Sequence, residues 1–258
     1  MSLSLASAPL AYWAVLAGVF GLAMGSFFTV AAYRWPREES LVTPRSHCTG
    51  CERTLHWYEL VPVLSWVLQR GHCRGCGSGI SWRYPAIELV SGALASTAIL
   101  TFGPTLKGLA AMILVLTLVP VVVIDLEHKL IPDIIVLPAA AAALALVIAE
   151  QPDRWWVPIT GALGASLFLL ILALVYPGGM GLGDVKLALL LGAVLGASVV
   201  PALAVAFFAG ALMGAVFLVR VGKAARKMAI PFGPFLAAGA LVALWFGPSM
   251  IDWYSGQF

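Results

Sequence analysis

Long apolar runs, each about as long as a bilayer is thick, constrain this chain more than any other feature. A helix needs about 20 apolar residues to cross the hydrocarbon core, and lipid offers no partners for open backbone groups, so helices are the expected form. Of the 258 residues, 61% are hydrophobic and 10% are charged, which is too little polar surface for a soluble domain. The sequence therefore predicts an all-α polytopic membrane protein with about eight transmembrane helices. The runs lie at residues 10–32, 86–103, 107–124, 134–149, 157–176, 185–200, 202–219 and 233–251.

The distribution of Lys and Arg predicts the orientation of these helices. The basic residues Arg34 and Arg37 follow the first run, whereas a secretory signal carries its positive charge before the apolar stretch. We interpret the run as a retained helix with its N-terminus outside. Of the 15 Lys and Arg residues, all but Lys107 and Arg154 then fall on the inner side, as the positive-inside rule requires. The net charge of +3 reflects this topology, and without a basic stripe carrying base-stacking aromatics we predict no nucleic-acid partner.

The one sizeable polar segment, residues 33–85, lies between the first two runs and on the inner side in this topology. It is too short for a large hydrophobic core, so it should need a cross-link or a bound metal to stabilise its fold. We therefore divide the chain into a first transmembrane helix (1–32), a cytoplasmic metal-binding domain (33–85) and a transmembrane core (86–258). We detect no internal repeat, low-complexity tract or long linker.

All four cysteines lie in the polar segment and form two CxxC pairs. The pairs are separated by about 20 residues and each contains Gly, which is typical of structural zinc sites. Four thiolates leave no open coordination position, so the zinc would stabilise the fold rather than catalyse a reaction. Two disulfides are the alternative, but a cytoplasmic location disfavours them; a redox role is a second alternative. We expect the neighbouring His47, His56 and His72 to be surface residues. The predicted ligands are Cys48, Cys51, Cys73 and Cys76.

Two aspartates stand at the edges of apolar runs on the same predicted membrane face. Asp125 ends the third run and Asp184 begins the sixth, after a glycine-rich approach that includes Gly181 and Gly183. An acid at the edge of hydrocarbon is costly and indicates function. Two carboxylates brought together share a proton, and one can then activate water while the other protonates a carbonyl oxygen. This pattern favours an intramembrane aspartyl peptidase.

Other roles for the acids remain open at this stage. Asp184 could cap the N-terminus of its helix, and Asp125 could simply mark a helix end. We interpret Asp133 as the N-cap of the fourth span and Glu88 as a weaker polar candidate that faces the helix bundle. A proton- or ion-coupled transporter is the main alternative class, because intramembrane acids also mark ion pathways. The sequence lacks the GxSxG and HExxH patterns of serine and zinc hydrolases.

Several short motifs resemble those of the bacterial prepilin peptidases, the type IV leader peptidase and N-methyltransferase family of aspartyl type. The resemblance covers nearly the whole chain in order and spacing. It rests on Gly25-Ser26-Phe27, Tyr33-Arg34-Trp35-Pro36, the double CxxC segment, Arg83-Tyr84-Pro85, Glu88-Leu89, Asp125 with Ile131-Pro132-Asp133, Gly181-Leu182-Gly183-Asp184 with Lys186, and Pro231-Phe232-Gly233-Pro234-Phe235-Leu236.

The resemblance implies that Asp125 and Asp184 are the catalytic pair. It implies cleavage of the basic leader from type IV prepilins or type II secretion pseudopilins at the cytoplasmic side of the bacterial inner membrane. It also implies N-methylation of the new N-terminus with S-adenosylmethionine, and Gly25 matches a glycine linked to that step. Gly181, Gly183, Lys186 and Glu88 are further site candidates. The chain departs from the family at Thr29, where members usually carry Asn.

Overall fold

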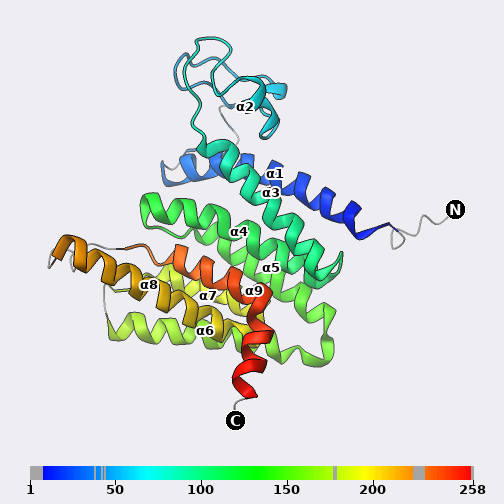
Figure 1. Cartoon of the computed structure of the whole chain (residues 1–258), viewed down its shortest axis with the longest axis vertical. Helices are drawn as coiled ribbons and strands as arrows, with labels where there is room; N and C mark the ends of the chain where they lie inside the picture. Colours follow the sequence, from blue (N-terminus) through cyan, green and yellow to red (C-terminus); the bar gives the residue numbers. More distant parts are fainter. Residues whose placement is uncertain are drawn as a thin grey trace. The chain divides into compact units, whose positions relative to one another are not determined.

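The computed structural model describes residues 8–37, 39–41, 43, 45–176, 179–222 and 230–256. These residues are largely helical, and they contain two isolated β-bridges but no strand (Figure 1). Lys223, Arg226 and Lys227, three of the basic residues behind the predicted orientation, lie outside this part of the chain. The elements are α1 (Leu10–Arg34), η2 (Trp35–Arg37), η3 (Trp57–Glu59), α2 (Leu64–Leu68), α3 (Arg83–Phe102), α4 (Leu106–His128), α5 (Asp133–Glu150), η4 (Pro152–Arg154), α6 (Trp156–Val175), α7 (Leu182–Leu195), η5 (Gly196–Ser198), α8 (Val199–Val221) and α9 (Gly233–Ser255).

Each predicted apolar run corresponds to one of these helices. By length and composition alone the described residues hold seven candidate membrane spans, because Leu182–Arg220 forms one apolar stretch of 39 residues. The backbone divides that stretch at Gly196, whose φ of 54° permits a turn into the short η5. The prediction of eight helices is therefore confirmed for the backbone, with α7 as the shortest at 14 residues.

The chain forms two compact units, which divide after Pro104. In the first unit, α1 packs along α3 through small side chains on both helices. A Cβ on Gly21 would lie 2.9 Å from the Cα of Gly92, and the Ser96 hydroxyl donates a hydrogen bond to the Ala14 carbonyl at 2.8 Å. Close backbone approach of this kind is how helices associate where no hydrophobic effect drives them.

In the second unit, α6 and α7 form one close pair and α8 and α9 another. A Cβ on Gly192 would overlap the carbonyl oxygen of Gly161 in α6, and one on Gly239 would overlap the carbonyl oxygen of Ala202 in α8. Gly247 packs against Ser198, so α8 and α9 run antiparallel. The chain reverses direction between α7 and α8, so α8 runs back toward the end of the bundle where α7 begins.

Helix α4 is the most buried span of the second unit. Of the residues in its most apolar stretch, 67% are buried inside the protein. Its fully buried side chains include Leu114, Val115, Val121 and Ile124. A helix enclosed in this way has little freedom to move, so the residue at its end is held in a defined position. That residue is Asp125, which is 4% exposed.

Replacing Gly192 by Ala should destabilise the second unit, because the added methyl would push the α6 backbone away. Overpacking of this kind costs about 1–3 kcal/mol. The matched control is Gly164→Ala in α6, where a Cβ would meet no atom within 4 Å. Thermal unfolding of both purified variants in one detergent tests the contact. Equal melting temperatures for the two variants would show that α6 and α7 do not pack through this contact.

Candidate functional site

Two buried aspartates lie in the second unit, one at the end of α4 and one at the start of α7. Asp125 is 4% exposed and Asp184 is 6% exposed. Helix α4 ends three residues after Asp125, where Lys129 takes the left-handed conformation with φ of 55° and donates its N–H to the Asp125 carbonyl at 2.9 Å. The two acids lie in one region, because Gly183, which precedes Asp184, packs against Ile131, six positions after Asp125. The structure thus brings together the two acids that the sequence singled out.

A glycine N–H binds each of these carboxylates. Gly233 donates to Asp125 Oδ2 at 2.9 Å, and Gly181 donates to Asp184 Oδ2 at 3.1 Å. A Cβ on Gly233 would lie 2.6 Å from Asp125 Oδ2, so a side chain at this position would displace the carboxylate. Hydrogen bonds from backbone N–H groups orient a carboxylate without introducing a counter-charge.

Gly233 was missed as a site residue in the sequence analysis, which recorded Pro231-Phe232-Gly233-Pro234 only as a family motif. The available signal was a glycine between two prolines at the start of an apolar run. Its partner is 108 positions away along the chain. No local pattern shows which side chain such a glycine will meet.

The residues around Asp184 are those that the sequence named, but the role of Asp133 differs. Asp184 is the third residue of α7 and accepts the N–H of the N-cap Gly181, so it caps the helix from inside the first turn and is not itself the N-cap. Asp133 is the first residue of α5 and follows the N-cap Pro132, which corrects the prediction by one position.

Asp133 instead pairs with Lys186, whose Nζ lies 2.6 Å from Asp133 Oδ2. Both side chains are partly exposed, at 52% and 38%, and an exposed pair contributes little to stability. The pair nevertheless links the start of α5 to the start of α7, beside Asp184. Gly183 packs against Ile131 at the same place, where a Cβ would lie 2.8 Å from the Ile131 Cβ.

In the first unit, Glu88 is 7% exposed and accepts the Val63 N–H at 2.7 Å through Oε2. Val63 has a φ of 61°, which is unusual for a β-branched residue. The buried carboxylate therefore ties a strained turn of the polar segment to the first turns of α3. Glu88 was expected to face a helix bundle as a polar candidate, and the structure gives it this positioning role.

Gly25 lies in the contact between α1 and α3. A Cβ there would lie 2.7 Å from the Glu88 Cα and 2.9 Å from the Ser91 Oγ. Helix α3 therefore fills the space beside the Gly25 Cα. This leaves no room for a cofactor to contact Gly25 there. Thr29, where the chain departs from the family motif, donates its hydroxyl to the Ser26 carbonyl at 2.7 Å within α1.

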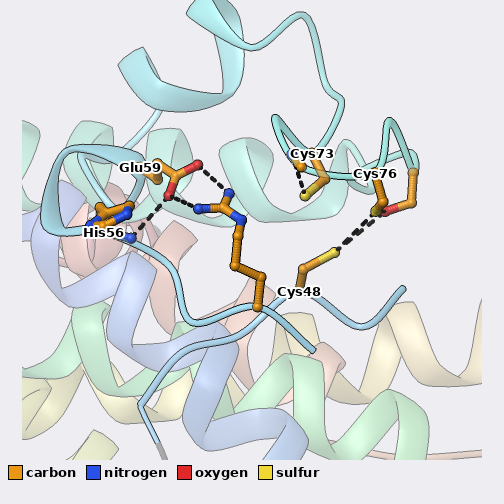
Figure 2. Close-up of polar contacts among 8 residues, drawn as sticks. Cys48, His56, Glu59, Cys73 and Cys76 are labelled. Carbon is orange, nitrogen blue, oxygen red and sulfur yellow. Dashed lines mark hydrogen bonds and ion pairs between the residues drawn. The ribbon is translucent and has the colours of Figure 1, made fainter. Parts of the chain in front are cut away.

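The four cysteines form one cluster in the polar segment, and Figure 2 shows Cys48, Cys73 and Cys76 of this cluster. All four are free thiols, and their sulfur atoms lie within 4.8 Å of one another. Cys48 Sγ and Cys76 Sγ are 3.8 Å apart, which matches the roughly 3.8 Å between sulfurs placed tetrahedrally about 2.3 Å from a zinc ion. The residues present therefore fit a four-thiolate metal site. His47, His56 and His72 are exposed and stand outside the cluster, as the sequence predicted.

The two CxxC pairs have the same local structure, a short internal repeat that the sequence analysis overlooked. His47 bridges to Thr54 and His72 bridges to Gly79, with the same spacing. Within each pair, the glycine N–H contacts the sulfur of the first cysteine, from Gly50 to Cys48 and from Gly75 to Cys73, both at 3.4 Å. In the sequence the repeat is visible as His-Cys-x-Gly-Cys, at residues 47–51 and 72–76, whereas the bridge partners Thr54 and Gly79 are different residues.

Hydrogen bonds also tune these thiols. The Ser78 side chain, followed by the N–H groups of Gly50 and Cys51, lowers the pKa of Cys48 to about 6. For Cys51 the Arg53 backbone N–H lowers the pKa, but the Cys76 thiol and burial outweigh it and raise the pKa to about 11. Negative charge on one sulfur opposes ionisation of its neighbours, which is the repulsion that a bound cation relieves.

An ion pair stabilises the same segment beside the cysteines. Arg53 donates two hydrogen bonds to Glu59, at 3.0 Å and 2.7 Å, and the His56 N–H donates a third at 2.9 Å. Figure 2 shows the hydrogen bonds at Glu59 as dashed lines. Hydrogen bonding from Arg53 lowers the pKa of Glu59 from 4.5 to about 2. A bidentate pair of this kind fixes geometry as well as charge.

Glu59→Gln should lower the thermal midpoint of unfolding at pH 7, because the variant cannot form the ionic pair with Arg53. A lowered pKa contributes stability that is complete above about 4.5 and lost as pH falls through about 2. The difference in midpoint between wild type and variant should therefore shrink at acid pH. Glu39→Gln, at an exposed position in the same segment, is the control. A difference that stays constant from pH 7 to pH 3 would contradict this role for the pair.

Together these features define a polytopic helical membrane protein with paired, backbone-bonded aspartates at one end of a bundle and a separate four-cysteine segment. Comparison with known proteins narrows the class. Residues 19–102 match the bacterial peptidase A24 N-terminal domain, and residues 112–219 match the type IV leader peptidase family. The chain belongs to the type IV leader peptidase family. No solved structure matches it.

Curated relatives match over most of their lengths. A prepilin leader peptidase/N-methyltransferase of Bacillus subtilis (strain 168) is 40% identical, covering 92% of this chain and 95% of the relative. Proteins of the same name in Burkholderia pseudomallei (strain 1026b) and Stutzerimonas stutzeri are 36% and 34% identical, covering 94% and 97% of this chain and 91% and 96% of those relatives. These matches do not support the transporter alternative.

Proposed function

We propose that this protein is an intramembrane aspartyl endopeptidase that removes the leader from type IV prepilins or type II secretion pseudopilins. The observation that carries the proposal is the meeting of buried Asp125 and Asp184, each bound by a glycine N–H, in a chain whose relatives are named prepilin leader peptidases. The substrates' own apolar helices would lie in the bilayer that the spans of this chain cross.

The two aspartates supply the chemistry. Carboxylates that interact electrostatically share one proton near their working pH. The ionised member then takes a proton from water as it attacks the scissile carbonyl, and the protonated member donates to the carbonyl oxygen. The hydrogen bonds from Gly233 and Gly181 hold one oxygen of each carboxylate in place and so orient the pair.

We place the site at the cytoplasmic side of the bacterial inner membrane, with the N-terminus in the periplasm. The end of α4 and the starts of α5 and α7 lie together with Lys129 and Lys186, and 13 of the 15 basic residues share the inner side in this topology. A leader that remains in the cytoplasm would reach the aspartates there.

Asp125→Asn and Asp184→Asn should each reduce cleavage by about 10²- to 10⁴-fold, the usual contribution of acid–base catalysis. The assay incubates each purified variant with a prepilin and follows loss of the leader mass. Asp252→Asn, at an exposed acid in α9, should cleave like the wild type. Full cleavage by either of the two catalytic variants would exclude the pair mechanism.

The same proposal includes methylation of the new N-terminus with S-adenosylmethionine, as the relatives' N-methyltransferase names imply. S-adenosylmethionine would supply the methyl group. Gly25 packs against α3 and is not assigned to hold it. Adding S-adenosylmethionine to the cleavage assay and weighing the product tests this activity through one additional methyl mass.

The cysteine cluster would hold a structural Zn²⁺ through Cys48, Cys51, Cys73 and Cys76. A closed four-thiolate site stabilises a small segment and leaves the metal no open position for catalysis. Its place in the chain, between α1 and α3, makes it a fold element of the first unit.

Elemental analysis of the purified chain should find about one zinc per protein. Cys48→Ser should release the metal, because three remaining thiolates leave the tetrahedral site open. The matched control is His72→Ala, which removes an exposed side chain next to a ligand and should retain full zinc. Equal zinc contents in the two variants would contradict the assigned ligand set.

A further inference from the structure

A cavity lies at the end of the second unit opposite the aspartates. It has a volume of about 180 Å³ and lies where α4 and α6 begin and where α5 and α7 end. A single water needs roughly 10–15 Å³ of such space, so the cavity admits a larger group. It is distinct from the proposed catalytic site, which lies at the other ends of α4 and α7.

The charged residues that line this cavity include Lys107 and Arg154. These are the only two basic residues that break the inward bias of the sequence, and they lie 47 positions apart along the chain. Cations on the outer side oppose the positive-inside tendency, and yet both occur at one cavity. Because Lys107 and Arg154 line the same cavity, we expect their positive charges to act on a group bound there.

One acid, Glu150, also lines the cavity, and its Oε2 accepts the Leu106 N–H at 3.1 Å. With Lys107 and Arg154 the lining charges sum to +1, which complements one monoanion. Asp153 is adjacent to Arg154 in η4, but it is exposed and is not part of the lining. The cavity therefore favours an anion with a single negative charge, such as a phosphodiester.

The surroundings point to a lipid as the source of that phosphodiester. The cavity lies where the apolar spans end, and Val147, Val157 and Leu195 form an apolar part of its wall. Trp155 and Trp156 follow Arg154 and are each 55% exposed. Tryptophans of this kind mark the headgroup level of a bilayer, and basic pockets between membrane helices bind anionic headgroups.

We propose that this cavity binds the headgroup of an anionic phospholipid from the outer leaflet, with Lys107 and Arg154 on its phosphate and the apolar wall against its glycerol region. The inference needs these helices to span a bilayer with the Lys107 end of α4 at the outer side. It does not depend on the peptidase proposal.

Native mass spectrometry of the full chain, released from micelles with phosphatidylglycerol or phosphatidylcholine, tests the site. Wild type should retain one phosphatidylglycerol in preference to phosphatidylcholine. The Lys107→Gln/Arg154→Gln double variant should lose about 30-fold in affinity for it, since each cation near a lipid surface contributes about a factor of five. The matched control is Arg45→Gln/Arg220→Gln, which removes two exposed cations elsewhere and should bind like wild type.

Three results would overturn the assignment: no preference for phosphatidylglycerol over phosphatidylcholine, equal retention by the double variant and the control, or displacement of the lipid by inorganic phosphate alone. The last would identify a free-phosphate site. If the double variant fails to fold, Lys107→Arg/Arg154→Lys keeps both charges and should retain the lipid, whereas Lys107→Gln alone should weaken it. Equal retention by these two variants would also contradict the proposal.

Discussion

Keeping two carboxylates at the edge of hydrocarbon is the constraint on which the second unit depends. Each must be shielded from lipid, oriented, and close enough to its partner for their charges to interact. The structure meets this requirement with backbone, since Gly233 binds Asp125 and Gly181 binds Asp184. A cationic side chain at either carboxylate would stabilise its ionised form, whereas a backbone N–H orients the acid with less bias toward permanent ionisation.

Small residues make this arrangement possible. Water drives little association between helices inside a bilayer, so close contact must come from van der Waals packing. Gly161 against Gly192 and Gly239 against Ala202 allow backbone contact within two helix pairs. The same device in the first unit brings Gly25 against Glu88. A glycine that a family motif links to function can therefore act through packing, because the neighbouring helix fills the space beside it.

The polar segment solves a different problem, since it is too small to be stabilised by a hydrophobic core. Four sulfurs within 4.8 Å, the Arg53–Glu59 pair and the bond from Val63 to Glu88 replace that core. The cysteine spacing was sufficient to predict the cluster of four thiols, because a two-residue gap lets both thiols of a pair face the same point. The repeated backbone bridges begin at equivalent histidines, His47 and His72, but their partners Thr54 and Gly79 are chemically unlike, so the sequence does not show the pairing.

The sequence by itself determined the helical class, the positions of the helices to within a few residues, the cysteine cluster and the two acids. These follow from local chemistry: hydrocarbon thickness sets the length of an apolar run, and a charge within or beside one is conspicuous. Only the tertiary structure decided that Gly233 binds Asp125, that Glu88 holds Val63, and that Lys107 and Arg154 line one cavity. Each of these contacts joins residues far apart in the chain, and helix packing, which periodicity does not encode, selects the partners.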